Sequence, residues 1–344
     1  MRGEDLLAGS PLVIWGAGAM GGSIGAALVR EGVDVLFVDK VQDHVRAMRD
    51  RGLKITGPVD EFTVPVQAAG PLELKGLFPL IFLCVKSQHT AEALGQLEPH
   101  LTGDGAVVSI QNGLCELEIA AALGAERTVG AFVNFGADFL EPGVIHRGNR
   151  GATVVGETDG SLSQRVRGIH ELLRVFEPDA VLTENIFGFL WGKLAYASLL
   201  FATALTDSSI ADVLADKKSR PTLIALARET VGVALAKGVA LQGFDGFDPD
   251  AFRPNGPTTR AETSLDGLVA FNRASAKTHS GIWRDLAVRK RTTEVDAQLG
   301  WIVKIGTDVG VSTPLTEAVI RQIHEIERGD RSQVWENLEE LRTS

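Results

Sequence analysis

The chain has 344 residues, of which 44% are hydrophobic and 23% are charged, a composition typical of globular proteins. Its length favours two domains, and its formal net charge of −10, without a basic block, argues against a nucleic-acid partner. The two cysteines and seven histidines show neither a disulfide framework nor a spacing typical of metal ligands, so we expect no metal.

The first half of the chain is predicted to alternate strands with helices. The predicted strands are Leu12–Trp15, Val33–Val38, Leu80–Val85, Ala106–Ile110, Val129–Asn134 and Thr153–Gly156. The helices predicted between them are Met20–Arg30, Thr90–Leu97 and Leu114–Leu123. Strands that alternate with crossover helices form a parallel, doubly wound sheet. Gly143 and Gly148-Asn149 are interpreted as turns between the later strands, which can then extend that sheet in antiparallel fashion.

After about Ser161 no strand is predicted and helical periodicity dominates. The predicted helices are Ser163–Phe176, Phe187–Leu205, Pro221–Lys237, Thr263–Lys277, Val295–Asp308 and Pro314–Glu327. Gly243–Thr259 is rich in Asp, Pro, Gly and Phe and is predicted to be a loop. One face of the helix after Glu294 is predicted to be buried, and it carries Val295, Leu299, Ile302, Val303 and Gly306. We therefore expect an α/β domain over residues 1–180 and an all-α domain over residues 181–344.

The apolar segments and the N-terminus favour a soluble protein. The opening decapeptide mixes charges and leads directly into the first strand, unlike a signal peptide. The longest apolar helical stretch, Leu194–Leu205, is too short to span a bilayer. We therefore expect a cytoplasmic protein in a reducing compartment, without a membrane partner.

A glycine-rich turn follows the first predicted strand. It consists of Gly16, Ala17, Gly18, Ala19, Met20 and Gly21. In a dinucleotide-binding turn, the first glycine permits the tight turn, the second lets the pyrophosphate approach the backbone, and the third lets the helix pack on the sheet. The N–H groups at the start of the helix are suited to phosphate binding. A glycine-rich turn in another α/β fold is the alternative, but the strand, helix, second strand and acidic residue expected of a Rossmann-type domain are all present.

Asp39 ends the second predicted strand, where a carboxylate accepts a hydrogen bond from the ribose 2′-OH of NAD. A 2′-phosphate at this place would meet a like charge, which costs roughly 4 kcal/mol for each charge pair at about 4 Å and an effective dielectric constant near 20. Lys40 offsets part of that cost. We therefore expect NAD(H) to be favoured over NADP(H).

Two polar residues follow strands of the predicted sheet, at the edge where ligands bind in such folds. Lys86 comes after Leu80–Val85 and is predicted to lie near the cofactor or the substrate; an ordinary lysine at a strand end is the alternative. Asn112 follows Ala106–Ile110 and can fix the nicotinamide or a substrate oxygen. Its alternative role is in a turn, since Asn-Gly is a strong turn dipeptide.

Lys193 is the only charged residue in a long apolar helix. A buried ammonium group is costly unless it is paired or functional, and burial favours the neutral amine, which suits proton transfer near neutral pH. A lysine that reaches water from a helix end is the alternative. Glu294 precedes another helix and is expected to pair with Lys193 or to bind a cofactor hydroxyl; capping of the first helical turn is its alternative role.

Together these motifs resemble the ketopantoate reductase (2-dehydropantoate 2-reductase) family. The motifs, which follow the family's order from Leu12 to Glu327, are GAGAMG, Val85-Lys86-Ser, Gln111-Asn-Gly, Trp191-Gly-Lys-Leu and Ser280…Asp285-Leu…Thr293-Glu-Val-Asp. The resemblance implies a Rossmann-type domain, a helical domain like that of 6-phosphogluconate dehydrogenase, and reduction of a 2-oxo acid with a nicotinamide cofactor. It also leads us to expect a homodimer supported by the apolar helices.

The resemblance also implies roles for individual residues. Lys193 would be the general acid that protonates the alkoxide, or the base in the reverse direction, and Glu294 would support the cofactor and the active site. Asn112 and Lys86 would line the cleft for cofactor and substrate, and Gly136 would pass close to the cofactor. We therefore group Lys193, Glu294 and Asn112 as the predicted catalytic residues.

The chain departs from the family where the substrate is held. Ala197 and Phe201 occupy the positions of two substrate-binding asparagines, and only Ser280 remains of a serine pair. Each lost hydrogen bond weakens binding by about 1 kcal/mol. We therefore expect a bulkier or more apolar substrate than ketopantoate, in contact with Lys193, Ala197, Phe201 and Ser280. Authentic ketopantoate reduction in pantothenate synthesis is one alternative, and a non-catalytic sensor of nicotinamide nucleotides is another.

Overall fold

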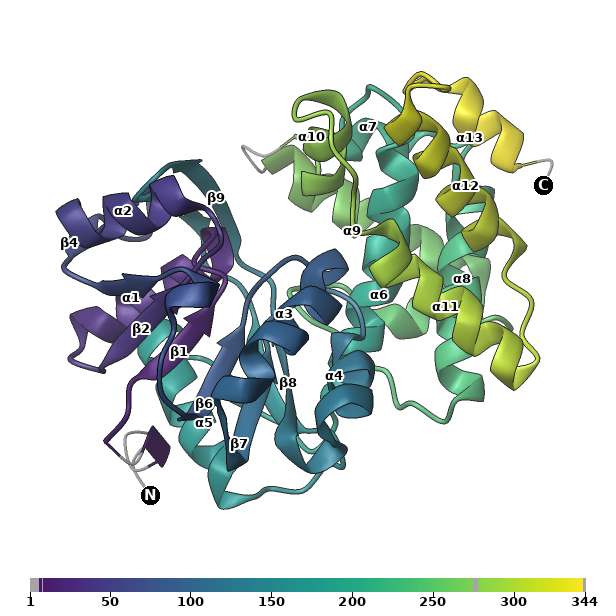
Figure 1. The fold of residues 1–344 in the computed structure, drawn as a ribbon. Helices are drawn as coiled ribbons and strands as arrows, with labels where there is room; N and C mark the ends of the chain where they lie inside the picture. The colour runs from purple at the N-terminus through teal and green to yellow at the C-terminus, as the bar shows by residue number, and fades with distance from the viewer. Residues whose placement is uncertain (1–5, 8, 275–277, 343–344) are drawn as a thin grey trace. The chain divides into compact units, whose positions relative to one another are not determined.

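The computed structural model describes residues 6, 7, 9–274 and 278–342. The chain divides into two compact units, Met1–Ile186 and Phe187–Ser344. The predicted fold class, an α/β sheet domain followed by a helical domain, is confirmed (Figure 1). The division falls after the predicted residue 180 because a short strand, β12 (Val181–Leu182), still belongs to the sheet of the first unit.

The first unit is built on an eight-stranded sheet with the order β12-β11-β8-β7-β6-β1-β2-β5. Its other strands are β1 (Leu12–Trp15), β2 (Val35–Val38), β5 (Gln67–Ala69), β6 (Phe78–Leu83), β7 (Leu101–Ser109), β8 (Thr128–Val133) and β11 (Thr153–Glu157). All neighbouring strands are parallel except β8 and β11, which are antiparallel. The predicted doubly wound sheet is therefore present, and the carboxyl ends of β1, β2, β6 and β7 share one edge.

Apolar cores cover both faces of this sheet. Successive side chains of a strand point to opposite faces, so Ile14 of β1 joins the core that contains residues of α1 (Ala19–Arg30) and α5 (Gln164–Phe176). Val13 joins the other core with residues of two further helices, α3 (Thr90–Leu97) and α4 (Cys115–Leu123). Figure 1 shows α3 and α4 in front of the sheet.

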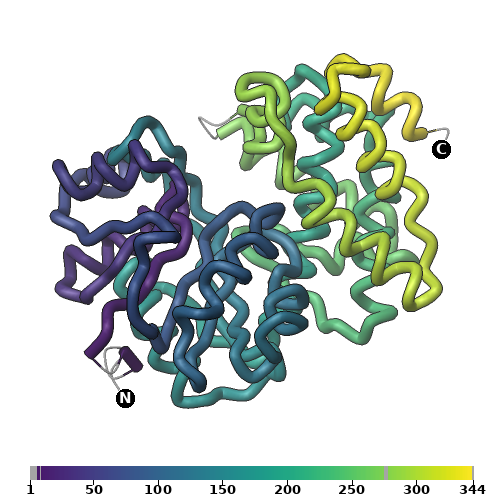
Figure 2. The backbone as a smooth tube through the Cα atoms, in the orientation of Figure 1, coloured from purple at the N-terminus to yellow at the C-terminus, as the bar shows by residue number. Residues whose placement is uncertain are grey.

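A second sheet of four strands was not predicted. Its order is β4-β3-β10-β9, and its strands are β3 (Leu53–Thr56), β4 (Phe62–Val64), β9 (Gly136–Glu141) and β10 (Val144–Asn149). Gly143 does lie in the turn between β9 and β10, but Gly148 and Asn149 belong to β10, so their prediction as a turn is wrong. Of the later strands, β11 provides the antiparallel extension, since β10 pairs with β3 instead. Figure 2 shows the teal backbone of this later segment running beside the purple backbone of the N-terminal segment.

Within the described residues, the helical unit contains five α-helices that the sequence predicts and three that it does not. The predicted ones are α6 (Ile186–Thr203), α8 (Arg220–Ala236), α9 (Thr258–Ala274), α11 (Val295–Val309) and α12 (Pro314–Arg328). The others are α7 (Ile210–Ala215), α10 (Gly281–Ala287) and α13 (Glu336–Leu341). The predicted end of α9 at Lys277 lies outside the described residues. In α11 the predicted buried face is correct except for Val303, which is partly exposed.

Several short elements lie in connections that the sequence left unassigned. They are α2 (Gln42–Arg51) and the 3-10 helices η2 (Pro71–Glu73), η3 (Ser87–His89), η4 (Glu98–His100), η5 (Ala125–Arg127) and η6 (Pro249–Phe252). The last of these interrupts the predicted loop Gly243–Thr259.

Helix α6 is longer than Leu194–Leu205, the apolar stretch weighed in the sequence as a membrane span. Among the described residues it is the one helix long and apolar enough to cross a membrane, with 18 residues and a mean hydropathy of 1.4. The expectation that the longest apolar helix is too short is therefore wrong. Because 72% of this stretch is buried inside the protein, α6 has the burial of a core helix.

Candidate functional site

The glycine-rich turn has the backbone geometry of a phosphate-binding turn. Gly16 has a φ of +100°, and a side chain there would come within 2.8 Å of the backbone nitrogen of Val85. A Cβ on Gly21 would collide with the carbonyl oxygen of Gly16 and lie 2.8 Å from the Cβ of Cys84. These two glycines therefore let α1 pack closely against the sheet.

Gly18 leaves the start of α1 open. It occupies the N-cap position without a side-chain capping bond, and no described atom lies within 4 Å of the place its Cβ would take. The first turn of α1 also contains no acidic residue. A helix N-terminus without a cap or a negative charge has N–H groups suited to an anion, so this turn fits the pyrophosphate of a dinucleotide.

Two side chains hold the peptide groups of Ala17 within this turn. The N–H of Ala17 donates to Oδ2 of Asp39 at 2.9 Å, and its carbonyl oxygen lies 2.8 Å from Nε2 of His44 on α2. The N–H of Gly143 donates to Nδ1 of His44 at 2.9 Å, so Nδ1 is an acceptor. Nε2 must then carry the proton and donate to Ala17, which makes the buried ring neutral.

Asp39 therefore acts on the turn as well as facing the site at the end of β2. Its Oδ1 accepts a hydrogen bond from the N–H of Val41 at 2.9 Å. An ionised carboxylate has about four acceptor sites, so two remain for hydroxyl groups of a sugar. Lys40 is more exposed and pairs with Glu92 at 3.5 Å on the surface.

The residues predicted at the other strand ends lie at the same edge of the sheet. Lys86 and Asn112 are both partly exposed and follow β6 and β7. The side chain of Gln111, which directly precedes Asn112, donates to the carbonyl oxygen of Val85 at 3.0 Å and to Oγ1 of Thr90 at 2.8 Å. Gln111 thus ties together the two loops that carry Lys86 and Asn112, a role that its sequence position did not predict.

Gly136 begins β9 in the second sheet. A Cβ at this position would collide with Oδ1 of Asn149, to which β9 is paired. The packing of this hairpin by itself therefore requires a small residue here, whatever the role of Gly136 toward a cofactor.

In the helical unit, Lys193 is half-buried rather than fully buried. The partly exposed residues in the middle of α6 are Phe189, Lys193, Tyr196 and Leu200, whose spacing places them on one face. Ala197 is 8% exposed and Phe201 has no exposed surface. Phe201 is thus a core side chain in this structure, which disagrees with its prediction as a substrate residue.

Tyr196 is the polar neighbour of Lys193 on that face. Burial raises the pKa of its hydroxyl group, against the effect of a hydrogen bond with Asn272 of α9. Its ring lies 5.3 Å from that of Phe247. The sequence analysis did not single out Tyr196, because the resemblance to the family pointed to Ala197, the next position along the helix.

Ser280 and Glu294 stand at the starts of two helices. Oγ of Ser280 accepts a hydrogen bond from the N–H of Trp283 at 3.1 Å, so Ser280 caps α10 and is almost buried. Glu294 occupies the N-cap position of α11, but its side chain makes no capping bond. Capping by its side chain, the alternative role considered for Glu294, is therefore absent from the structure.

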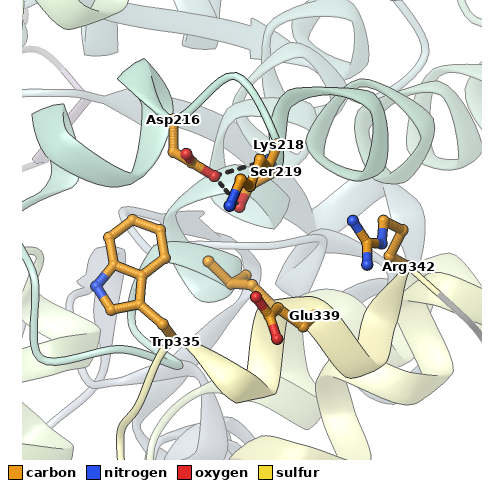
Figure 3. A pocket seen from close by; sticks show the side chains of 7 residues that line it. Asp216, Lys218, Ser219, Trp335, Glu339 and Arg342 are labelled. Atoms are coloured by element: carbon orange, nitrogen blue, oxygen red, sulfur yellow. Dashed lines mark hydrogen bonds between the residues drawn. The ribbon is translucent and has the colours of Figure 1, made fainter.

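A pocket of about 270 Å³ lies elsewhere in the helical unit, between the turn before α8 and helix α13 (Figure 3). Its lining residues are Asp216, Lys218, Ser219, Trp335, Leu338, Glu339 and Arg342. Asp216 accepts hydrogen bonds from the N–H and Oγ of Ser219. None of the predicted site residues lines this pocket. Among the residues that the structure describes, no cluster of three or more His, Cys, Asp or Glu could hold a metal ion.

A doubly wound sheet with this turn and an acidic residue after its second strand, followed by a helical unit, is typical of nicotinamide-dependent oxidoreductases. Residues 12–160 match the family described as ketopantoate reductase PanE/ApbA, and residues 185–327 match the C-terminal domain of the same family. The chain belongs to the ketopantoate reductase family.

Individual relatives agree with this assignment. The 2-dehydropantoate 2-reductase of Streptococcus pyogenes is 25% identical over 314 residues, which cover 90% of this chain and 96% of that protein. A solved D-mandelate dehydrogenase with NADH and anilino(oxo)acetate has a TM-score of 0.80 at 20% identity, covering 93% of this chain and 98% of that one. The 2-dehydropantoate 2-reductase of Geobacter metallireducens has a TM-score of 0.79 at 24% identity, covering 92% and 99%. The two structures show a shared fold, and the predicted family and its nicotinamide-dependent oxidoreductase class are confirmed.

Proposed function

We propose that this protein interconverts a 2-oxo acid and a 2-hydroxy acid, with NAD(H) preferred and with a substrate other than ketopantoate. The observation that carries the proposal is the partly exposed face of α6, where Lys193 stands beside Tyr196, together with the replacement of the family's two asparagines by the buried Ala197 and Phe201. When bound, the nicotinamide supplies or accepts the hydride at its C4.

The roles of the protein groups follow from their chemistry. Lys193 donates a proton to the C2 oxygen of the 2-oxo acid as charge develops there, and in the oxidative direction it removes that proton. The side-chain amide of Asn112 donates a hydrogen bond to a substrate oxygen or to the nicotinamide amide. Lys86 and Glu294 hold the cofactor, and Asp39 accepts from its ribose.

The character of the substrate is proposed from the face of α6 that carries Lys193. Tyr196 on that face is partly exposed, and its ring packs against the buried rings of Phe244 and Phe247 in the same unit. An aromatic ring on this face favours 2-oxo acids with a bulky or aromatic side chain over the hydroxylated side chain of ketopantoate. Ser280 is proposed as a further substrate contact.

Initial rates test this proposal. Purified protein is assayed with ketopantoate, an aliphatic 2-oxo acid and benzoylformate, each with NADH and with NADPH. We expect benzoylformate with NADH to give the highest kcat/KM of the six combinations. Equal or better turnover of ketopantoate would contradict the proposed substrate class and favour authentic 2-dehydropantoate reduction.

The proposed role of Lys193 has its own test. We expect Lys193→Ala to lower kcat by roughly 10²- to 10⁴-fold, the usual contribution of a general acid, while NADH binding measured by fluorescence is retained. Lys237→Ala, at an exposed lysine of the same unit, is the control and should match the wild type. Full turnover in Lys193→Ala would exclude this lysine as the acid, whereas nucleotide binding without turnover by the wild type would favour the sensor alternative.

We further propose a cytoplasmic homodimer. The exposed Phe271 on α9 and Val288 after α10 are apolar side chains that a second copy could cover. Light scattering on the eluting protein should then give twice the chain mass of 36.7 kDa, and a single chain mass would contradict the dimer.

A further inference from the structure

Glu294 lies at the end of a segment without regular secondary structure. Residues 288–294 connect α10 to α11, and Lys290 within them has a positive φ of 48°. The carbonyl oxygen of Glu294 accepts the first helical bond of α11, from Gln298. The hydrogen bonds of α11 therefore fix the backbone that follows Glu294. The residues that precede it must be held by other contacts.

Side chains of α12 provide these contacts on both sides of Glu294. Oε1 of Glu327 accepts hydrogen bonds from the N–H and from Oγ1 of Thr293, both at 2.7 Å. Oε2 of the same carboxylate lies 2.9 Å from Nδ1 of His324. Nε2 of His324 in turn lies 3.0 Å from Oδ1 of Asp296. The residues immediately before and shortly after Glu294 are thus tied to one helix.

Whether His324 can donate both of these hydrogen bonds depends on its charge. Carboxylates only accept hydrogen bonds when ionised, so both ring nitrogens must donate, and only the imidazolium can do so. Burial opposes that charge, but hydrogen bonds and attraction from Glu327 and Asp296 outweigh it, and the pKa of His324 is raised. Among the described residues, Glu327 on α12 and Asp296 on α11 are the charged groups that face the ring.

We propose that Asp296, His324 and Glu327 form a positioning bridge that holds residues 293–296, so that Glu294 is placed to support the cofactor. The proposal rests on the proposed function, which gives Glu294 that role. Loss of the His324 proton removes one of the two donated bonds, so the bridge weakens and Glu294 is held less firmly as the pH rises.

The test is the dissociation constant of NADH, measured by fluorescence titration between pH 6 and pH 9, because it needs no knowledge of the substrate. We expect Glu294→Gln to weaken NADH binding at every pH. His324→Gln, which can make only one of the two donated bonds, should weaken binding roughly fivefold at pH 6, as expected for about one hydrogen bond. The wild type should approach the affinity of His324→Gln as the pH rises, while that variant stays flat.

Controls separate positioning from stability. Asp296→Asn changes an exposed side chain, so this variant should fold even if His324→Gln does not. It should show part of the loss of NADH affinity expected for His324→Gln. His170→Gln removes a histidine of the first unit that bonds to the carbonyl oxygen of Ala180, and it should keep the wild-type pH profile. A purely structural bridge would lower the melting temperature of these variants but leave the pH profile of NADH affinity unchanged.

Two results would overturn the proposal, and they distinguish failure of the proposed role of Glu294 from failure of the bridge alone. If Glu294→Gln binds NADH as the wild type does, the role of Glu294 in the proposed function fails and the bridge fails with it. If Glu294→Gln weakens binding while the His324 and Asp296 variants match the wild type at all pH values, Glu294 keeps its role and only the bridge is refuted.

Discussion

At the scale of single residues, Asp39 combines two tasks that affect cofactor choice differently. Its charge disfavours a 2′-phosphate, and its oxygens hold the N–H groups of Ala17 and Val41. We expect Asp39→Asn to raise the ratio of NADPH affinity to NADH affinity at least tenfold, which is about 1.4 kcal/mol of the roughly 4 kcal/mol repulsion. Absolute NADH affinity should fall, because an amide can accept only one of the two bonds.

Fluorescence titration with both nucleotides measures this ratio. Asp43→Asn, which removes an exposed carboxylate from the nearby α2, should leave the ratio unchanged. Asp39→Ala should lose more affinity for both nucleotides, since it leaves both N–H groups without the carboxylate. An unchanged ratio in Asp39→Asn would show that this carboxylate does not set cofactor preference.

His44 is the second residue whose contacts fix the glycine-rich turn. Replacement by Leu would leave the carbonyl oxygen of Ala17 and the N–H of Gly143 without their partner, at about 1–3 kcal/mol for each buried group. We expect His44→Leu to lower the urea midpoint and also to weaken NADH binding. His100→Leu, at a partly exposed histidine whose Nδ1 lies 3.1 Å from the carbonyl oxygen of Gly76, serves as the comparison. Stability loss with unchanged NADH affinity would limit His44 to a structural role.

At the scale of elements, helix α12 begins with a cap supplied by another helix. Its own N-cap residue makes no side-chain bond, and the carboxylate of Glu229 on α8 accepts from the N–H of Leu315 at 2.9 Å and from the N–H and Oγ1 of Thr316 at 2.8 and 2.7 Å. We expect Glu229→Ala to cost about 1–2 kcal/mol, the usual range for a lost cap. Urea unfolding measures this, with the exposed Glu317→Ala as the control.

The same carboxylate makes stability depend on pH in an unusual direction. Burial raises the pKa of Glu229 from its usual 4.5, against the opposing effect of its hydrogen bonds with residues 315 and 316. The folded state therefore binds this proton more tightly than the unfolded state does, and the contribution is lost as pH rises through the raised pKa. Relative to Glu229→Gln, the wild type should lose stability as pH increases above about 4.5. A difference that stays constant with pH would contradict this.

The sequence predicts elements well where local pattern and packing agree. The turn between β1 and α1 could be read because glycine spacing, apolar strands and Asp39 all lie within one short stretch. The second sheet could not, because β3 and β10 pair across a long separation and β3 has only four residues. Helix α2 is short and strongly polar, with only four buried residues among many charged ones, so its sequence offers few apolar positions from which to predict it.

The candidate site shows the same limit. Asp39 and Lys193 could be proposed as site residues from their positions in the sequence. His44, in contrast, acts through hydrogen bonds to residues 27 and 99 positions away, which no local pattern reveals. Phe201 was chosen by alignment to the family, and its complete burial on α6 follows from helix periodicity and packing. Tyr196, one position before Ala197, lies instead on the partly exposed face of α6 that carries Lys193.

At the scale of the whole molecule, the proposed function assigns cofactor-binding roles to residues of each unit. The glycine-rich turn and Asp39 belong to the first unit, and Glu294 belongs to the second. NADH at a hundred times its dissociation constant stabilises the state that binds it by about 2.7 kcal/mol. We expect NADH to slow amide hydrogen exchange in residues 16–22 and also in residues 293–296.

The variant Glu294→Gln tests whether this side chain is needed for the NADH-dependent protection of residues 293–296. It should keep the NADH-dependent protection of residues 16–22, because Asp39 and His44 still hold that turn, and it should lose the protection of residues 293–296. Protection confined to the first unit in the wild type would mean that the sheet domain binds the nucleotide alone. The second unit would then contribute only the proton donor Lys193, and the support proposed for Glu294 would be wrong.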